Sequence, residues 1–118
     1  MVKGRLLLVD DEAALLDLLK RYLERIGYSV EAYSRPGAAL AAFQSDPASY
    51  RLVLTDLTME EMSGEEMIER MRALNPSLKA IISSGYPYES PTPSTVFLQK
   101  PYVPKLLEDL IAKLLAQA

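Results

Sequence analysis

Short segments rich in apolar and β-branched residues alternate along the chain with longer segments in which apolar residues recur every three or four positions. The short segments cover residues 5–9, 29–33, 51–55, 79–84 and 95–99. A short apolar run of this kind is typical of a strand that is buried on both faces of a sheet. We therefore expect five buried strands.

The longer segments carry the pattern of amphipathic helices. We expect helices over residues 13–26, 36–44, 64–74 and 103–116. Spacing of three and four residues places apolar side chains on one face of a helix, and Gly27 stands where the C-terminal cap of the first helix belongs. The first and last helices have the longest apolar stripes, which are Leu15, Leu18, Leu19, Tyr22, Leu23 and Ile26 in one and Leu106, Leu107, Leu110, Ile111, Leu114 and Leu115 in the other.

The alternation of strands and helices predicts an α/β protein with a doubly wound, five-stranded parallel sheet, because buried parallel strands need helices on both faces. A length of 118 residues predicts one domain, covering residues 1–118. Residues 85–94 break the pattern, since they contain three prolines where a helix between the fourth and fifth strands is expected. Proline inside a helix costs about 3 kcal/mol, so we expect this helix to be shortened or absent.

The residue types that the chain lacks exclude several kinds of chemistry. It contains no cysteine and no histidine, and its net charge is −3. Zinc sites of Cys and His, thiolate nucleophiles and Ser–His–Asp triads are excluded, so any site must use oxygen and amine groups. The scattered acidic charge argues against direct binding to nucleic acid. No apolar stretch predicts a signal peptide or a membrane segment, and we expect a cytoplasmic protein.

Charged and hydroxyl side chains stand where the predicted strands end. Asp10 and Asp11 follow the first strand, Asp56 follows the third, Ser84 ends the fourth and Lys100 follows the fifth. In an open parallel sheet, ligands bind in the crevice beyond the carboxyl ends of the strands. We therefore expect three carboxylates, a hydroxyl and an ammonium to meet at one edge of the sheet.

Each of these residues also has an ordinary structural explanation. Asp10 or Asp11 could cap the following helix, Asp56 could be a turn residue and Lys100 a surface lysine. Independent turn residues have no reason, however, to place acids, a hydroxyl and an amine at four strand ends that the fold brings together. The combination favours a functional site.

Five segments together resemble one known family. They are LLVDDE at 7–12, VLTDLTM around Asp56, Met62-Ser63-Gly64, Ser84-Gly85-Tyr86 and FLQKPY at 97–102. This set resembles the receiver domain of two-component response regulators. The residues of its last two segments, Ser84-Gly85-Tyr86 and FLQKPY, are most similar to those of receivers of hybrid sensor histidine kinases. The resemblance implies the flavodoxin-like receiver fold and a role in a phosphorelay.

The resemblance implies that Asp56 is the phosphoacceptor and that the cofactor is Mg²⁺. The metal ligands would be Asp10, Asp11, Asp56 and the backbone carbonyl of Thr58. The partner would be a histidine kinase or a histidine phosphotransferase domain, since this chain has no histidine of its own. A homodimer is also possible for such a domain.

The resemblance also implies how the phosphoryl group is held and sensed. Lys100, Ser84 and the amide of Gly85 would bind its oxygens, with Lys100 and Ser84 acting beside Asp56 in catalysis. Ser84 and Phe97 would form the switch that reports phosphorylation. Receivers often have proline where this chain has Glu60, so we expect the loop after Asp56 to be more mobile and more acidic than usual.

The isolated domain would not be an enzyme beyond catalysing its own phosphorylation and dephosphorylation, although a hybrid parent would be a histidine kinase. The main alternative is a receiver-like module that binds proteins without phosphorylation. A phosphohydrolase or a flavin protein of the same topology is disfavoured, because the first strand is followed by Asp-Asp-Glu and not by a phosphate-binding loop. Treatment with acetyl phosphate or beryllofluoride in the presence of Mg²⁺ would separate these hypotheses.

Overall fold

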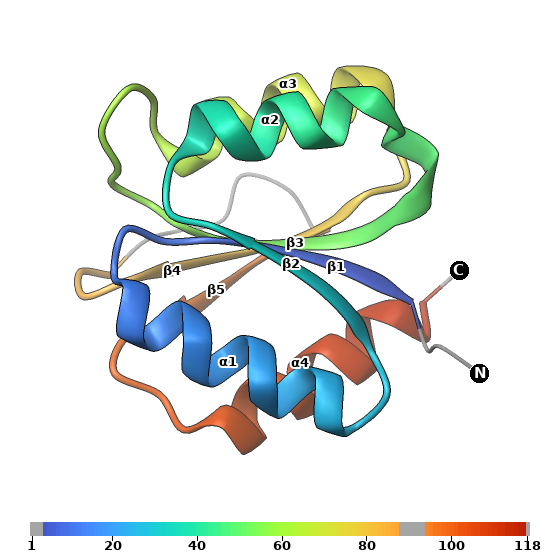
Figure 1. Cartoon of the computed structure of the whole chain (residues 1–118). Helices are drawn as coiled ribbons and strands as arrows, with labels where there is room; N and C mark the ends of the chain where they lie inside the picture. The colour runs from blue at the N-terminus through green and yellow to red at the C-terminus, as the bar shows by residue number, and fades with distance from the viewer. Residues whose placement is uncertain (1–3, 88–93, 118) are drawn as a thin grey trace.

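Five parallel strands form one sheet with helices on both faces (Figure 1). The computed structural model describes residues 4–87 and 94–117. The strands lie in the order β2-β1-β3-β4-β5, and every neighbouring pair is parallel. Their bounds are β1 (Arg5–Val9), β2 (Ser29–Tyr33), β3 (Tyr50–Asp56), β4 (Lys79–Ser84) and β5 (Thr95–Gln99).

Two pairs of helices cover the sheet. Helices α1 (Ala13–Arg25) and α4 (Pro104–Leu115) lie on one face, and α2 (Pro36–Ser45) and α3 (Gly64–Leu74) lie on the other (Figure 1). A short 3₁₀ helix, Pro47–Ser49, which the sequence pattern did not predict, precedes β3. Within the described residues, no helix has both the length and the apolar composition that crossing a membrane requires. The predicted α/β fold with a doubly wound sheet is confirmed.

The core has two halves, one on each face of the sheet. In β1, Leu6 and Leu8 pack under α1 and α4, whereas Leu7 and Val9 pack under α2 and α3. All four side chains are at most 1% exposed. Because successive side chains of a strand point to opposite faces, a strand covered on both faces needs apolar residues at every position. This explains the continuous apolar run at the start of the chain.

The two leucine-rich helices bury only part of their predicted stripes. Leu18 in α1 is 54% exposed and Leu106 in α4 is 50% exposed, whereas Leu16, which was not part of the predicted stripe, is buried. Each residue turns an α-helix by about 100°, so neighbouring leucines cannot all face the sheet. A segment in which most positions are leucine does not by itself show which of them point inward.

The turns follow the local sequence. Gly27 has φ of 112°, and the amides of Gly27 and Tyr28 donate to the carbonyls of Glu24 and Leu23, respectively, which confirms the predicted cap of α1.

The predicted loss of a helix between β4 and β5 falls on residues 85–94. Of these, the described residues are 85–87 and 94, and none of them is helical. The rest of that proline-rich segment lies outside the described residues.

Candidate functional site

Three aspartates meet at the carboxyl end of the sheet. Asp10 and Asp11 directly follow β1, and Asp56 is the last residue of β3, which is the neighbour of β1 in the sheet. One carboxylate oxygen of each lies within 4.8 Å of those of the other two. Asp10 is 6% exposed, Asp56 is half-buried and Asp11 is exposed. The expectation that these acids come together is confirmed.

Lys100 brings the positive charge to this cluster. Its backbone amide donates to the carbonyl of Ser84 at 2.8 Å, which continues the pairing of β4 and β5. Its ammonium nitrogen lies 2.8 Å from Oδ2 of Asp10 and 3.7 Å from Oδ1 of Asp56. The cluster therefore combines three formal negative charges with one positive charge.

The surroundings of Asp56 make its ionisation harder. Burial raises the pKa of the Asp56 carboxyl group, and the charges of Asp10 and Asp11 raise it further. The ammonium of Lys100 and the amide of Leu57, which donates to Oδ1 of Asp56 at 3.0 Å, partly offset this effect. The pKa of Asp56 therefore lies above its usual value, as expected for a carboxylate that lacks full charge compensation.

Lys100 and Tyr102 respond to the same charges. Burial lowers the pKa of Lys100, but its hydrogen bond to Asp10 and the negative charges of Asp10, Asp56 and Glu12 outweigh burial and raise it. Burial, and then the same three carboxylates, raise the pKa of the Tyr102 hydroxyl. The lysine is therefore held in its charged form, and the tyrosine is held neutral.

Neither aspartate after β1 caps helix α1. The residue that caps α1 is Glu12, whose side chain makes no capping hydrogen bond. Oδ1 of Asp10 accepts a hydrogen bond from the amide of Glu12 at 2.9 Å. Among the described residues, the Asp11 carboxylate has no hydrogen-bond or ion-pair partner. The capping explanation therefore does not account for Asp11.

The residues proposed to hold and sense a phosphoryl group lie on β4 and β5. Ser84 is 4% exposed, and its hydroxyl oxygen accepts a hydrogen bond from the amide of Tyr86 at 3.0 Å. A Cβ added to Gly85 would meet no atom within 4 Å, so the space beside its backbone is open. Phe97 is half-buried and pairs in register with Ile82 of β4.

The loop after Asp56 contains a contact that the sequence pattern did not predict. Backbone hydrogen bonds from Leu57 to Ser83 and from Gly64 to Leu57 fix its two ends at 2.9 Å each. At its tip, Oε1 of Glu61 lies 3.4 Å from Nε of Arg35. Arg35 and Glu61 are 26 residues apart in the sequence, and no local sequence pattern around Glu61 indicates that they form an ion pair. Thr58, in the same loop, is exposed.

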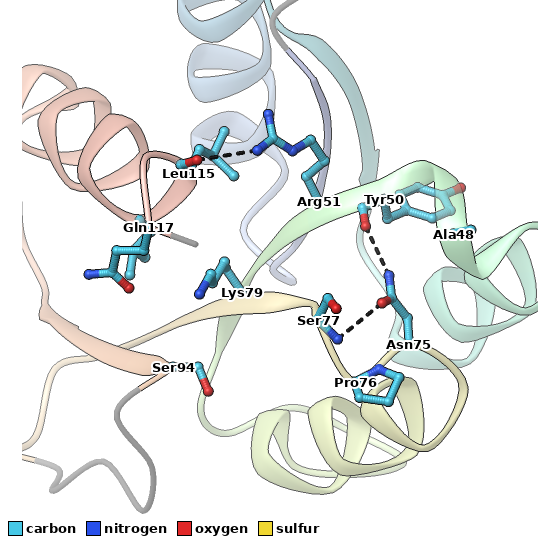
Figure 2. Close-up of a pocket in the computed structure, with 11 residues that line it drawn as sticks. Ala48, Tyr50, Arg51, Asn75, Pro76, Ser77, Lys79, Ser94, Leu115 and Gln117 are labelled. Carbon is cyan, nitrogen blue, oxygen red and sulfur yellow. Dashed lines mark hydrogen bonds between the residues drawn. The ribbon is translucent and has the colours of Figure 1, made fainter.

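Cavities flank the cluster of aspartates, but a larger one lies elsewhere. A cavity of about 310 Å³ is lined by residues that include Asp11 and Arg35, and one of about 360 Å³ is lined by residues that include Gly85 and Lys100. A cavity of about 580 Å³ lies at the opposite, amino end of the strands, where Arg51, Lys79 and other residues line it (Figure 2). None of its lining residues is acidic.

Comparisons with known proteins show what this chain is similar to. The model of the response regulator receiver domain matches residues 6–112. The chain is 31% identical to the response regulator receiver protein CpdR of Brucella abortus, over 97% of this chain and 98% of that protein. It is 33% identical to the photosynthetic apparatus regulatory protein RegA of Rhodobacter capsulatus, but spans only 43% of that protein and matches over 69% of this chain.

Solved structures show the same similarity. The receiver domain of the hybrid histidine kinase CckA has a TM-score of 0.87 and 26% identity, and the match covers 95% of this chain and 99% of that one. This agrees with the resemblance to receivers of hybrid kinases. The match of the family model over most of the chain, together with the identity to CpdR, shows that the chain belongs to the response regulator receiver domain family.

Proposed function

We propose that this domain accepts a phosphoryl group from a phosphohistidine of a partner protein onto Asp56, in the presence of Mg²⁺, and changes conformation as a result. Receiver domains are signalling domains that interact with histidine kinases or phosphotransferases. The observation that carries the proposal is the cluster of Asp10, Asp11 and Asp56, with oxygens within 4.8 Å of one another and Lys100 beside them.

The donor set fits Mg²⁺. Receiver domains bind this ion at an acidic pocket, and the three aspartates form such a pocket here. Mg²⁺ prefers oxygen ligands, and the site offers carboxylate oxygens without any thiolate or imidazole, since the chain has no cysteine and no histidine. Asp10, Asp11, Asp56 and, by resemblance, the carbonyl of Thr58 would hold it. When bound, the ion supplies the positive charge that neutralises the carboxylates and the incoming phosphoryl oxygens.

Asp56 acts as the nucleophile in this proposal. A carboxylate oxygen of Asp56 forms a bond to phosphorus while the bond from phosphorus to the imidazole nitrogen of the donor breaks. The nitrogen keeps the electron pair, and the imidazole takes a proton from solvent. Lys100, held in its charged form by the neighbouring carboxylates, supports the negative phosphoryl oxygens. Phosphoryl transfer depends on such positioning and charge neutralisation more than on further covalent chemistry.

Ser84 and Phe97 supply the proposed switch. The hydroxyl oxygen of Ser84 accepts a hydrogen bond from Tyr86, so its O–H can still donate to a phosphoryl oxygen. Phosphorylation adds negative charge and acceptor oxygens, which would draw Ser84 toward Asp56. Phe97, which is half-buried on the adjacent strand β5, would turn into the space that Ser84 leaves.

Acetyl phosphate tests this proposal with the purified chain. Intact-mass spectrometry of the wild type should show one added phosphoryl group when Mg²⁺ is present and none when it is chelated. The Asp56→Asn variant should remain unmodified under both conditions. If the wild type shows no response that depends on Asp56, the domain acts instead as an interaction module without phosphorylation.

Four further expectations from the sequence stay predictions. They are a single domain over residues 1–118, a cytoplasmic location, a homodimer and the absence of direct nucleic-acid binding.

A further inference from the structure

The loop of residues 57–63 is tied to the start of helix α2 through Glu61. One carboxylate oxygen of Glu61 lies 3.4 Å from Nε of Arg35, the residue just before α2. The other lies over Gly37 in the first turn of α2, at only 2.9 Å from the position that a Cβ of residue 37 would occupy. A negative charge is favourable at this end of a helix, where amide groups lack partners. We call the contact of Glu61 with Arg35 and Gly37 the loop latch.

The backbone of Glu61 has to be held in place. Its φ is 73°, in the left-handed region, and it is the only residue other than glycine with positive φ in the described part of the chain. L-residues visit this region infrequently, and such a conformation persists when surrounding contacts determine it. The loop latch is the contact that the Glu61 side chain makes. The strained backbone and the ion pair therefore belong to one arrangement.

The loop latch borders the proposed metal site. The cavity of about 310 Å³ has Asp11 among its lining residues, together with both members of the ion pair, Arg35 and Glu61. The ends of the loop are fixed by backbone hydrogen bonds, but within the described residues Glu61–Arg35 is the one ion pair that joins its tip to another element. Thr58, whose carbonyl is the proposed fourth protein ligand, lies between the fixed end and this tip.

We propose that Glu61 is a positioning residue, which through Arg35 and Gly37 holds the 57–63 loop in the conformation that lets the Thr58 carbonyl join the three aspartates in binding Mg²⁺. This inference rests on the metal site of the proposed function. A binding-competent conformation that is only partly populated weakens apparent affinity in proportion to its population. Loss of the loop latch therefore weakens Mg²⁺ binding even though Glu61 does not contact the ion.

The matched variants Glu61→Ala and Glu60→Ala separate positioning from general electrostatics. Each removes one acid from the same loop, but Glu60 has no ion pair among the described residues. We expect Mg²⁺ titrations followed by NMR amide shifts to show binding about two- to fivefold weaker for Glu61→Ala than for Glu60→Ala, the range that an exposed ion pair accounts for. Equal affinities of the two variants would overturn the proposal.

Gly37→Ala tests the loop latch without changing any charge. The new Cβ displaces the Glu61 carboxylate, whose flexible side chain can move. We expect weaker Mg²⁺ binding but a melting temperature that is equal or higher, because alanine is the better helix former. Affinity equal to that of the wild type would contradict the proposal.

Hydrogen exchange of the metal-free protein gives a readout that does not depend on Mg²⁺. Amides of residues 58–62 should exchange faster in Glu61→Ala than in Glu60→Ala. Faster exchange together with unchanged Mg²⁺ affinity refutes the positioning role while leaving the metal site intact. A wild type that binds no Mg²⁺ refutes the metal site itself, and the positioning role with it.

Discussion

The two ends of the sheet use polar side chains in different ways. At the amino end, polar groups bind backbone groups of the same chain. The Asn75 amide donates to the carbonyl of Tyr50, and Arg51 donates to the carbonyl of Leu115 (Figure 2). The Asn75 amide also donates to the carbonyl of Pro47. At the carboxyl end, Asp10, Asp11 and Asp56 face one another with a single ammonium among them.

The two ends differ in charge balance, and this difference, not cavity volume, is what the proposed function rests on. The cavity at the amino end is the larger, at about 580 Å³ against about 310 and 360 Å³ beside the aspartates. Arg51, which lines this cavity, lies at the carboxyl end of α4, where the helix dipole favours a positive charge even when no ligand is bound. The aspartates carry charge that the protein alone does not neutralise. We therefore assign the proposed metal binding to the aspartate end, and a stabilising role to the polar groups at the amino end.

Replacing Lys100 should give the largest difference between the two ends. We expect Lys100→Met to slow phosphorylation by acetyl phosphate about 10²- to 10³-fold, because a group that stabilises transition-state charge is lost. The matched variant Lys79→Met removes a lysine from the cavity at the amino end and should keep the wild-type rate. Initial rates from intact-mass spectrometry provide the measurement. Equal slowing in both variants would remove the distinction between the ends.

Magnesium should stabilise the protein through the carboxyl end alone. Like charges about 4 Å apart repel by roughly 4 kcal/mol at an effective dielectric of about 20, so a bound cation that relieves the repulsion among the aspartates favours the folded state. At about 100 times its dissociation constant, Mg²⁺ should stabilise the wild type by about 2.7 kcal/mol, seen as a rise in melting temperature. Asp11→Ala should lose this rise, and Arg51→Ala should keep it. The same rise in Asp11→Ala would argue against this metal site.

Asn75→Ala, at the amino end, should lower the free energy of unfolding without affecting phosphorylation. The change removes two hydrogen bonds to the carbonyls of Pro47 and Tyr50, and one from the amide of Ser77. We expect a loss of about 1–3 kcal/mol in urea unfolding, because carbonyls in a partly buried position lose their donor. Phosphorylation at a temperature where the variant stays folded should match the wild type. Impaired phosphorylation in the folded variant would mean that the two ends are coupled.

Alkaline pH should lower stability through Tyr50, at the amino end of β3. Burial, and then a hydrogen bond to Glu31, raise the pKa of Tyr50 to about 12. The unfolded value is about 10, so the neutral hydroxyl stabilises the fold fully below pH of about 10, and this contribution is lost as the pH rises toward 12. Tyr50→Phe should flatten the decline of unfolding free energy over that interval. An unchanged slope in the variant would contradict the assignment.

The sequence allowed the carboxyl end to be predicted, because residues at strand ends are placed by topology alone. Once five parallel strands are expected, Asp10, Asp56 and Lys100 must meet at one edge. The apolar run in β1 likewise required helices on both faces. These predictions depend on where each strand ends along the chain and on periodicity, which are properties of contiguous sequence.

Other features depend on side-chain contacts between distant segments. The ion pair of Glu61 with Arg35 depends on the packing of α2 against the loop after β3, and no local pattern predicts it. The rotation that exposes Leu18 and Leu106 depends on how each helix meets the sheet. That Asp11 has no side-chain partner within the described residues, whereas Asp10 binds both Lys100 and the amide of Glu12, also required the structure.

The measurement that tests the central claim most directly is phosphotransfer from a histidine phosphotransferase or kinase that carries labelled phosphate on its histidine. We predict that the label leaves the donor and appears on the wild-type chain only with Mg²⁺, and that peptide mass spectrometry locates it at Asp56. Asp56→Asn should receive none, and Asn75→Ala should receive as much as the wild type. Label transferred to Asp56→Asn, or no transfer to the wild type from any donor that phosphorylates another receiver, would contradict the account.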